Sequence, residues 1–264
     1  SEAAIEQAQP YIWASNESGE LEKVRPYDLD YRDEIEGDIA RAASAFIEAN
    51  ADEDEPFFLY VGWSSVHYPA GVSEAFRGRS PAGRYGDMFI EHDHSVGVVL
   101  DAIDDAGIRD NTVVIYISDN GPVSYEGKDH DFLGSSAGPF RGEVGDVLEG
   151  SLRVPGIVRW PGQMPVRKSN EMVAIHDFLP TFAALLDDTL PAERPIDGRD
   201  KEVDEGVLRT RGVDNLRVPL LLSPVRTVAL GGGSDEEAVC FDVLFSPAVL
   251  DVALPGGEAE DADR

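Results

Sequence analysis

Residues 112–122 read TVVIYISDNGP and join a short apolar run to a polar break. The run at 112–117 is rich in β-branched and aromatic side chains; it is long enough for a strand and too short for a buried helix. The break that follows contains an acid, an amide, a glycine and a proline. Ligands of α/β proteins gather at the carboxyl ends of strands, so Asp119 and Asn120 are predicted to lie where such a protein does its chemistry.

Asp119 and Asn120 offer adjacent carboxylate and amide oxygens, which are the donors that Ca²⁺ and Mg²⁺ prefer. The alternative is an ordinary hairpin, because Asn-Gly is the strongest two-residue turn signal. Taken alone, the stretch favours the turn. Against the turn, no alternating apolar run follows directly, since residues 125–138 are polar and rich in glycine.

The residues before this stretch alternate between helical and strand-like patterns. Residues 33–50 keep apolar side chains at helical spacing, and Asp33 is placed to cap the start of that helix. Residues 56–63, PFFLYVGW, form a continuous apolar run that predicts a strand buried on both faces. Residues 85–106 form the longest helical pattern, which Gly107 ends. The alternation predicts a layered α/β fold.

The residues after the loop add two further elements. Residues 152–160 return to strand character, and Pro155 within them predicts a sheet edge or a bulge. Asp177 is placed to cap a helix in which Pro180 occupies the tolerated first turn.

The texture of the sequence changes near residue 200. We therefore divide the chain into residues 1–200 and a divergent, strand-rich segment over residues 201–264. That segment ends in an acidic tail, which is predicted to be disordered. Its strand-like runs are 218–222, 225–230 and 238–245.

The charge balance excludes several classes of partner. The 264 residues contain 51 acids and 22 bases, which gives a formal net charge of −29. Nucleic-acid binding needs a basic face, and anionic membranes repel such a chain, so neither partner is expected. An acid excess with few lysines favours a halophilic protein, because molar salt shortens the Debye length to about 3 Å. The alternative is a mesophilic protein with acidic ends.

Cys240 is the only cysteine, so no internal disulfide framework exists. It lies in the apolar run AVCFDVLF, which indicates a small buried hydrophobe rather than a nucleophile. No run approaches the roughly 18 apolar residues of a membrane span, and no signal peptide is visible. Ser1 is not an initiator methionine, which indicates a fragment of a longer protein. The compartment stays open between cytoplasm and secretion into a high-salt medium.

An ordered set of motifs resembles the sulfatase family, the arylsulfatase-type enzymes of the alkaline-phosphatase superfamily. The resemblance runs from about residue 33 to residue 200, and each motif is weak alone. In chain order the motifs are PFFLY, H-x-P at 67–69, SDNGP, GSSAGPFRG, EGSLRVPGIVRWPG, HDFLPT and IDG. The resemblance implies an incomplete alkaline-phosphatase-like fold, with a mixed sheet sandwiched between helices.

The resemblance also implies an activity, the hydrolysis of small-molecule sulfate esters with a Ca²⁺ ion, or in some members Mg²⁺. By position, Asp119 and Asn120 match the family's second pair of metal ligands. His67 matches a histidine that contacts the sulfate and protonates the leaving-group oxygen, a role that suits a group titrating near neutrality. Lys128 and Arg141 are the cations predicted to bind the sulfate group.

The sequence departs from the family pattern at the nucleophile and at one cation. No C/S-x-P-x-R motif for formylglycine occurs, and the first metal-binding acids of the family are expected to lie before Ser1. Val144 stands where the family usually has a lysine. We therefore expect the chain alone to be inactive. The rival interpretations are a degenerate metal- or anion-binding relative, a phosphatase or phosphodiesterase of the same superfamily, and a gene product whose frame shifts after about residue 200.

Overall fold

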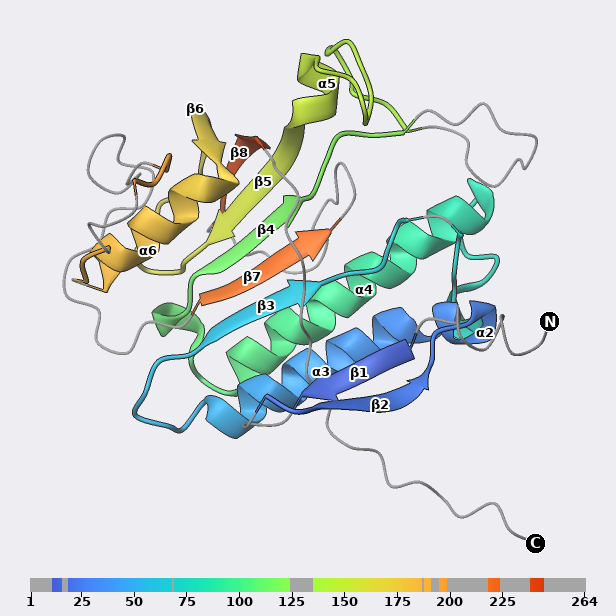
Figure 1. Cartoon of the computed structure of the whole chain (residues 1–264), viewed down its shortest axis with the longest axis horizontal. Helices are drawn as coiled ribbons and strands as arrows, with labels where there is room; N and C mark the ends of the chain where they lie inside the picture. Colours follow the sequence, from blue (N-terminus) through green and yellow to red (C-terminus); the bar gives the residue numbers. More distant parts are fainter. Residues whose placement is uncertain are drawn as a thin grey trace, which may run out of the picture.

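A computed structural model of the chain describes residues 11–15, 19–67, 69–123, 135–186, 188–190, 195–198, 218–223 and 238–244. Six strands form its central sheet in the order β3-β7-β4-β5-β8-β6 (Figure 1). These strands are β3 (Phe58–Gly62), β4 (Val114–Ser118), β5 (Arg153–Arg159), β6 (Arg167–Ala174), β7 (Val218–Ser223) and β8 (Ala238–Leu244). β7 runs parallel to β3 and β4, whereas β5 runs antiparallel to β4 and β8. The predicted mixed sheet is confirmed.

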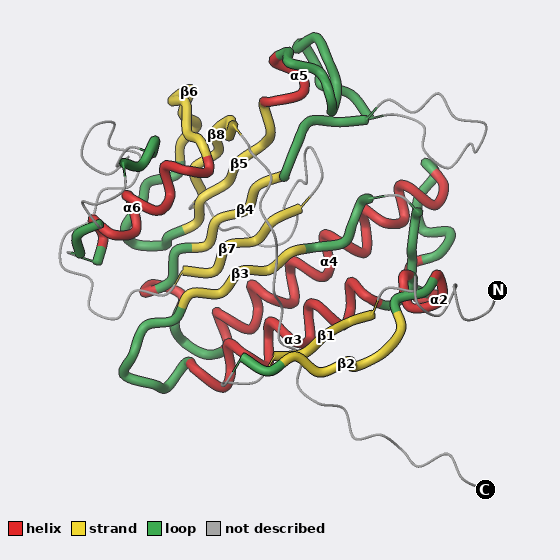
Figure 2. The backbone as a smooth tube through the Cα atoms, in the orientation of Figure 1, coloured by secondary structure: helices red, strands yellow, loops and turns green. Residues whose placement is uncertain are grey.

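Helices cover both faces of the sheet, as the tube in Figure 2 makes plain. α3 (Ile35–Asn50) and α4 (Gly83–Asp105) lie together on one face, and α6 (Phe178–Leu185) lies on the other. Smaller elements connect them: β1 (Tyr11–Ser15) and β2 (Leu21–Pro26) in a separate antiparallel sheet, α2 (Leu29–Arg32), η1 (Glu74–Phe76), η2 (Arg109–Asn111), α5 (Glu149–Leu152) and η3 (Ile175–Asp177). The α/β prediction is therefore confirmed, and Gly107 ends α4 with a left-handed φ of 71°.

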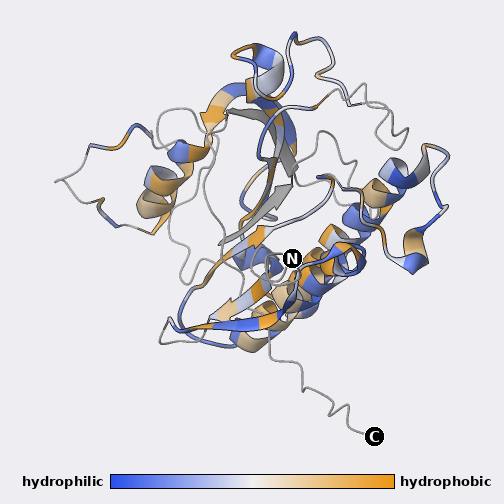
Figure 3. Ribbon diagram, turned by 45° about the vertical axis from the view of Figure 1, so that its right-hand side comes forward, coloured by the Kyte–Doolittle hydropathy of each residue, from blue (hydrophilic) through white to orange (hydrophobic). Residues whose placement is uncertain are grey.

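Strand β4 divides the core because its successive side chains point to opposite faces. Ile115 and Ile117 pack with Trp160 and Phe178 on the α6 side. Val114 and Tyr116 pack with α3 and α4 on the other side. In Figure 3, the long helices beside the sheet carry both apolar (orange) and polar (blue) residues, as expected of helices with one face turned to a sheet. All five residues of β4 are buried, so the strand is a rigid base for whatever follows Ser118.

Three local predictions are wrong, each for a reason of tertiary context. β3 is an edge strand with Phe58 56% exposed, because an apolar run does not reveal how many neighbours a strand will have. Pro155 lies inside the sheet on β5; it pairs with Asp242 of β8 and falls just beyond the ladder with β4, so its missing N–H breaks no bond there. Asp33 does not cap α3, because its carboxylate is taken by Val72, Arg77 and Arg84.

The proposed division at residue 200 stays a prediction. β7 and β8, the two described strands of the second segment, pair within the central sheet. The run at 225–230 and the acidic tail lie outside the described residues, as does the side chain of Cys240.

Candidate functional site

The site is built where β4 ends. Asp119 follows the buried strand directly and reaches the surface, and Asn120 beside it is half-buried. The Ser118 hydroxyl donates to the backbone oxygen of Asn120 over 3.1 Å, which fixes the path of the chain as it leaves the strand. Parallel neighbour β7 ends beside Ser118, so the end of β4 is also a carboxyl edge of the sheet.

The hairpin interpretation of Asn120-Gly121 is wrong. A two-residue turn of that type needs left-handed φ at both central residues, and Gly121 is not among the glycines with positive φ. Instead the Gly121 N–H donates to the backbone oxygen of Ser151 over 2.9 Å. The partner strand β5 begins only at Arg153, so a long connection separates the two strands.

Gly121 is glycine because backbone comes too close for any side chain. A Cβ on Gly121 would lie 2.1 Å from the oxygen of Gly150, and a Cβ on Gly150 would lie 2.3 Å from the oxygen of Gly142. Gly150 N–H also donates to the oxygen of Arg141 over 2.8 Å. These contacts stack three segments of the glycine-rich loop against the end of β4. They bring one glycine each from the SDNGP, PFRG and EGSLRVPG motifs into close packing.

The stacking brings Val144 and the backbone of Arg141 to the site. Val144 N–H donates to the oxygen of Pro122 over 2.8 Å. The position where the family usually has lysine therefore lies beside Pro122, which is two residues after Asn120 in the chain. The Arg141 side chain is exposed on the same loop. Lys128, the other predicted cation, lies outside the described residues, as does His130.

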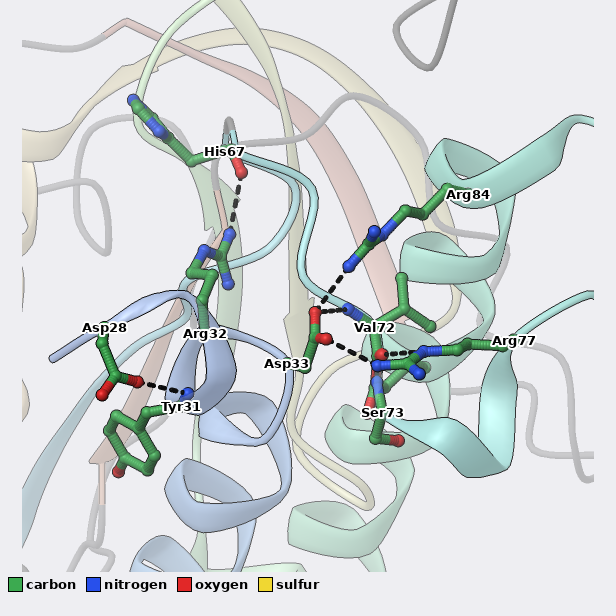
Figure 4. A network of polar contacts seen from close by, with 10 residues as sticks. Asp28, Tyr31, Arg32, Asp33, His67, Val72, Ser73, Arg77 and Arg84 are labelled. Atoms are coloured by element: carbon green, nitrogen blue, oxygen red, sulfur yellow. Dashed lines mark hydrogen bonds and ion pairs between the residues drawn. The ribbon is translucent and has the colours of Figure 1, made fainter.

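His67 belongs to the irregular segment that follows β3, and its side chain is exposed. Its N–H donates to the oxygen of Ser64 over 3.1 Å, which closes a tight turn. Figure 4 shows its imidazole pointing away from Arg32, which holds the backbone of the turn. The structure places His67 near enough to Asp119 for its positive charge to lower the pKa of that carboxyl.

The net effect on Asp119 is nevertheless a raised pKa. Partial burial of the carboxyl is the largest cause and raises the pKa. It outweighs four effects that lower the pKa: hydrogen bonds from the backbone of Asp119 and of Asn120, the charge of His67, and a hydrogen bond from the Asn120 side chain. Burial and the negative charge of Asp119 also raise the pKa of Tyr60 on β3. A bound cation would relieve both effects.

Sequence reasoning missed Tyr60, Arg32 and Glu36. Tyr60 ends the PFFLY motif, but its place in an apolar strand pattern indicated only a strand residue and no role at the site. Arg32 and Glu36 are 3% and 2% exposed, although their charge predicts a solvated surface position. The sequence offered no signal for this burial, because Arg32 ends α2 and Glu36 lies in the first turn of α3, where charged residues are usually exposed.

Three other histidines lie among the described residues. His92 is fully buried, and its Nε2 lies 3.0 Å from the hydroxyl of Tyr116. His94 is exposed. His176 and Asp177 precede α6: the Asp177 carboxylate accepts from the N–H of Ala174 over 2.9 Å, and a Cβ on Gly198 would lie 1.9 Å from the oxygen of His176. The HDFLPT and IDG motifs thus form one packing unit away from Asp119.

The donors suit a hard cation but are too few for a complete site. Asp119 and Asn120 give oxygen ligands, the right chemistry for Ca²⁺ or Mg²⁺, yet Ca²⁺ takes six to eight. Within the described part of the chain, no group of three or more His, Cys, Asp or Glu residues is placed to hold a metal. Among the same residues, no helix combines the length and apolar character needed to cross a bilayer.

Comparisons with known proteins agree on one family. The family model described as Sulfatase matches residues 10–188. The chain is 39% identical over 164 residues to steryl-sulfatase of Rattus norvegicus, covering 61% of this chain and 28% of that protein. It is 33% identical over 176 residues to N-acetylgalactosamine-6-O-sulfatase of Bacteroides thetaiotaomicron, covering 64% of this chain and 34% of that protein.

Solved structures give the same answer for the fold. The PsFucS1 sulfatase from Pseudoalteromonas sp. superimposes with a TM-score of 0.68 at 25% identity, over 81% of this chain and 42% of that one. The chain thus spans about a third of the length of the curated relatives named here. Its sheet is the alkaline-phosphatase-like sheet of these enzymes in part. The match over residues 10–188 settles the membership: the chain belongs to the sulfatase family.

Proposed function

We propose that this chain supplies part of the active site of a sulfuric ester hydrolase. One observation carries the proposal: Asp119 and Asn120 emerge together from the end of a buried strand, with the charge of His67 acting on Asp119. In this proposal the side-chain oxygens of Asp119 and Asn120 bind one side of a divalent cation, and His67 donates a proton to the leaving-group oxygen. The substrate is a small-molecule sulfate ester, and neither nucleic acid nor a membrane is a partner.

His67 has the exposure and the chemistry of a proton donor. Cleavage of a sulfate ester leaves an alkoxide or phenoxide oxygen that needs a proton, and imidazole is the side chain best matched to that transfer near neutrality. The exposed ring of His67 is accessible to a bound ester, and its backbone is held by a buried arginine. His67 is therefore the residue that we assign to protonation of the leaving-group oxygen.

Members of the family generally use a divalent metal, and we propose Ca²⁺ here, with Mg²⁺ as the alternative. Such an ion, when bound, polarises the sulfate oxygens. Asp119 and Asn120 would hold it from the β4 side. Because two donors are far short of six, the affinity of this chain for Ca²⁺ is expected to be millimolar at best.

Arg141 and Lys128 are proposed to bind the sulfate group. A guanidinium offers paired donors to a tetrahedral oxyanion, and Arg141 stands on the loop whose backbone packs against Gly150 and Gly121. Val144 favours a second candidate function, a non-catalytic relative that binds a cation or an anion. An apolar side chain beside Pro122 supplies no charge to a sulfate.

Calorimetry and an ester assay test the proposal together. In molar salt, Ca²⁺ titration of the chain should give millimolar binding that Asp119→Ala abolishes, and Asp93→Ala on α4 is the matched acidic control. Micromolar affinity would mean that this chain supplies the remaining ligands. We expect no turnover of an aryl sulfate by the chain alone. Turnover that vanishes in Asp119→Ala would contradict that expectation, and turnover of an aryl phosphate instead would favour the phosphatase interpretation.

A further inference from the structure

We propose that Arg32 and Glu36, two buried charged residues outside the site, are positioning residues that set the place of His67. This inference rests on the role proposed for His67 above. Neither side chain is expected to touch the substrate. Each instead bonds to the backbone of the turn that carries the histidine.

Arg32 holds the turn at both of its ends. One nitrogen, Nη2, donates to the oxygen of Ser64 over 2.9 Å and to the oxygen of His67 over 2.8 Å (Figure 4). Arg32 is 3% exposed, so water competes little for these charge-assisted bonds. The backbone of Arg32 adds a second contact, since a Cβ on Gly71 would lie 2.1 Å from its oxygen. Arg32 therefore contacts the segment after β3 at three positions, Ser64, His67 and Gly71.

Glu36 holds the middle of the same turn. Its Oε1 accepts from the N–H of Ser65, and its other oxygen, Oε2, lies 3.6 Å from Nδ1 of His92, which is ion-pair distance although longer than a normal hydrogen bond. His92 in turn lies 3.0 Å from the hydroxyl of Tyr116 on β4. Each of these side chains is at most 2% exposed.

The chain of contacts joins the two halves of the site. It runs from the turn of His67 through Glu36 and His92 to Tyr116, and Tyr116 lies three residues before Asp119 on a rigid buried strand. A core with only structural needs could fill this space with apolar side chains at no loss of stability. Buried charges that bond to the backbone of one functional turn are better explained by the precision that catalysis requires.

The test measures the order of the His67 ring in the 264-residue chain, without ester or cation. Histidine is labelled with ¹³C and ¹⁵N, the His67 signal is assigned with His67→Gln, and ring order parameters are measured for wild type and variants. We expect Arg32→Met to lower the His67 value from the ordered range to below about 0.6, while the His92 and His94 values stay unchanged. Arg32→Lys keeps the positive charge but replaces the planar guanidinium with a single ammonium nitrogen, so its value should fall between the two.

Matched variants separate positioning from general loosening. Arg77 also holds the segment after β3, because it donates to the carboxylate of Asp33 and to the oxygen of Val72. Arg77→Met removes these bonds and should leave His67 ordered. Glu36→Gln keeps an acceptor for Ser65 and should retain order, whereas Glu36→Leu should lose it. An ordered His67 in folded Arg32→Met would overturn the proposal. If that variant does not fold, wild-type order in Arg32→Lys would overturn it instead. The two proposals can fail separately. If Arg32→Met loses the order of the His67 ring and the wild-type chain binds no Ca²⁺, the positioning role is supported and the proposed hydrolase function is not.

Discussion

Gly121 lies against Gly150 so closely that a Cβ on Gly121 would come within 2.1 Å of the carbonyl oxygen of Gly150 and 2.8 Å of the Cα of Ser151. Gly121 follows Asp119 and Asn120 at the end of β4, and Gly150 lies in α5, just before β5 begins. The contact is between backbones, so it cannot be relieved by rotating a side chain. It holds residues 150–151 against Gly121, directly after Asp119 and Asn120 in the chain.

Gly121→Ala should therefore destabilise the protein and displace the loop. The added methyl group must push the backbone of residues 150 and 151 away, and overpacking of this kind costs about 1–3 kcal/mol. Urea unfolding at constant salt measures the loss of free energy. Ca²⁺ titration should show a weaker affinity in the same variant, because the loop moves with its glycines.

Gly97→Ala is the matched control for that substitution. Gly97 lies in α4, where an added Cβ meets nothing within 4 Å. Alanine in a helix interior is favoured over glycine, so this variant should gain about 0.5–1 kcal/mol. A Gly121→Ala protein as stable as wild type would show that the loop is free to move away from β4.

Asp119→Asn should stabilise the cation-free protein and remove its response to Ca²⁺. Burial raises the pKa of Asp119 in the folded protein, so the charged carboxylate costs stability at every pH above its folded value. The amide carries no such cost at neutral pH. Wild type should instead gain stability when millimolar Ca²⁺ is added, since a cation binds the folded state selectively. Thermal unfolding with and without a chelator measures both effects.

Asp93→Asn separates the two effects. Burial also raises the pKa of Asp93, which lies on α4. This variant should be stabilised like Asp119→Asn yet keep the wild-type response to Ca²⁺. A Ca²⁺ response that persists in Asp119→Asn would place the cation elsewhere.

The elements of the fold were predictable from local pattern, and their neighbours were not. The spacing of apolar residues gave α3 and α4, and Gly107 marked the end of α4. The edge position of β3 depends on which later strand joins it, and β7 is more than 150 residues away in the chain. Pro155 was misplaced because only the register with β4 and β8 shows that its missing N–H does no harm.

The site divides in the same way. Asp119 and Asn120 were visible as oxygen donors after a strand, and His67 entered through a motif. The residues that hold the turn of His67 were not visible, because Arg32 and Glu36 bond to backbone atoms that any sequence shares. Asn120-Gly121 predicts a turn, but the structure requires glycine at position 121 because the backbone of Gly150 packs too closely for a side chain. A left-handed φ is not the reason.

Two buried glutamates should respond to neutralisation in opposite directions. Burial alone would raise the pKa of Glu36, but its electrostatic interaction with His92 and its hydrogen bond from the N–H of Ser65 outweigh burial and lower the pKa below the ordinary 4.5. Burial raises the pKa of Glu91 above 4.5, and its bond to Ser73 offsets this only in part. At neutral pH, Glu36→Gln should therefore destabilise the protein and Glu91→Gln should stabilise it.

The pH dependence follows from the same signs. The contribution of Glu36 is present above its unfolded pKa and is lost as pH falls through the lower folded value. The penalty at Glu91 is absent below its unfolded pKa, grows as pH rises from that value toward the raised folded one, and is complete above the folded value. Both differences from wild type should shrink on acidification, as measured by denaturant unfolding at several pH values. Two variants that shift stability in the same direction at neutral pH would contradict the assignment of these environments.

Salt should stabilise the folded chain by screening its own charge. A formal net charge of −29 favours expanded states, and the Debye length falls from about 10 Å at 0.1 M to about 3 Å at 1 M salt. The melting temperature should rise with NaCl and level off near 1 M, where screening is nearly complete. Sucrose at equal osmolality is the control, because it acts by exclusion from the protein surface and leaves charge repulsion intact. Equal stabilisation by both solutes, or a rise that continues linearly in NaCl, would mean that surface repulsion is not what limits the stability of this protein, and the halophilic interpretation of its acid excess would fall with it.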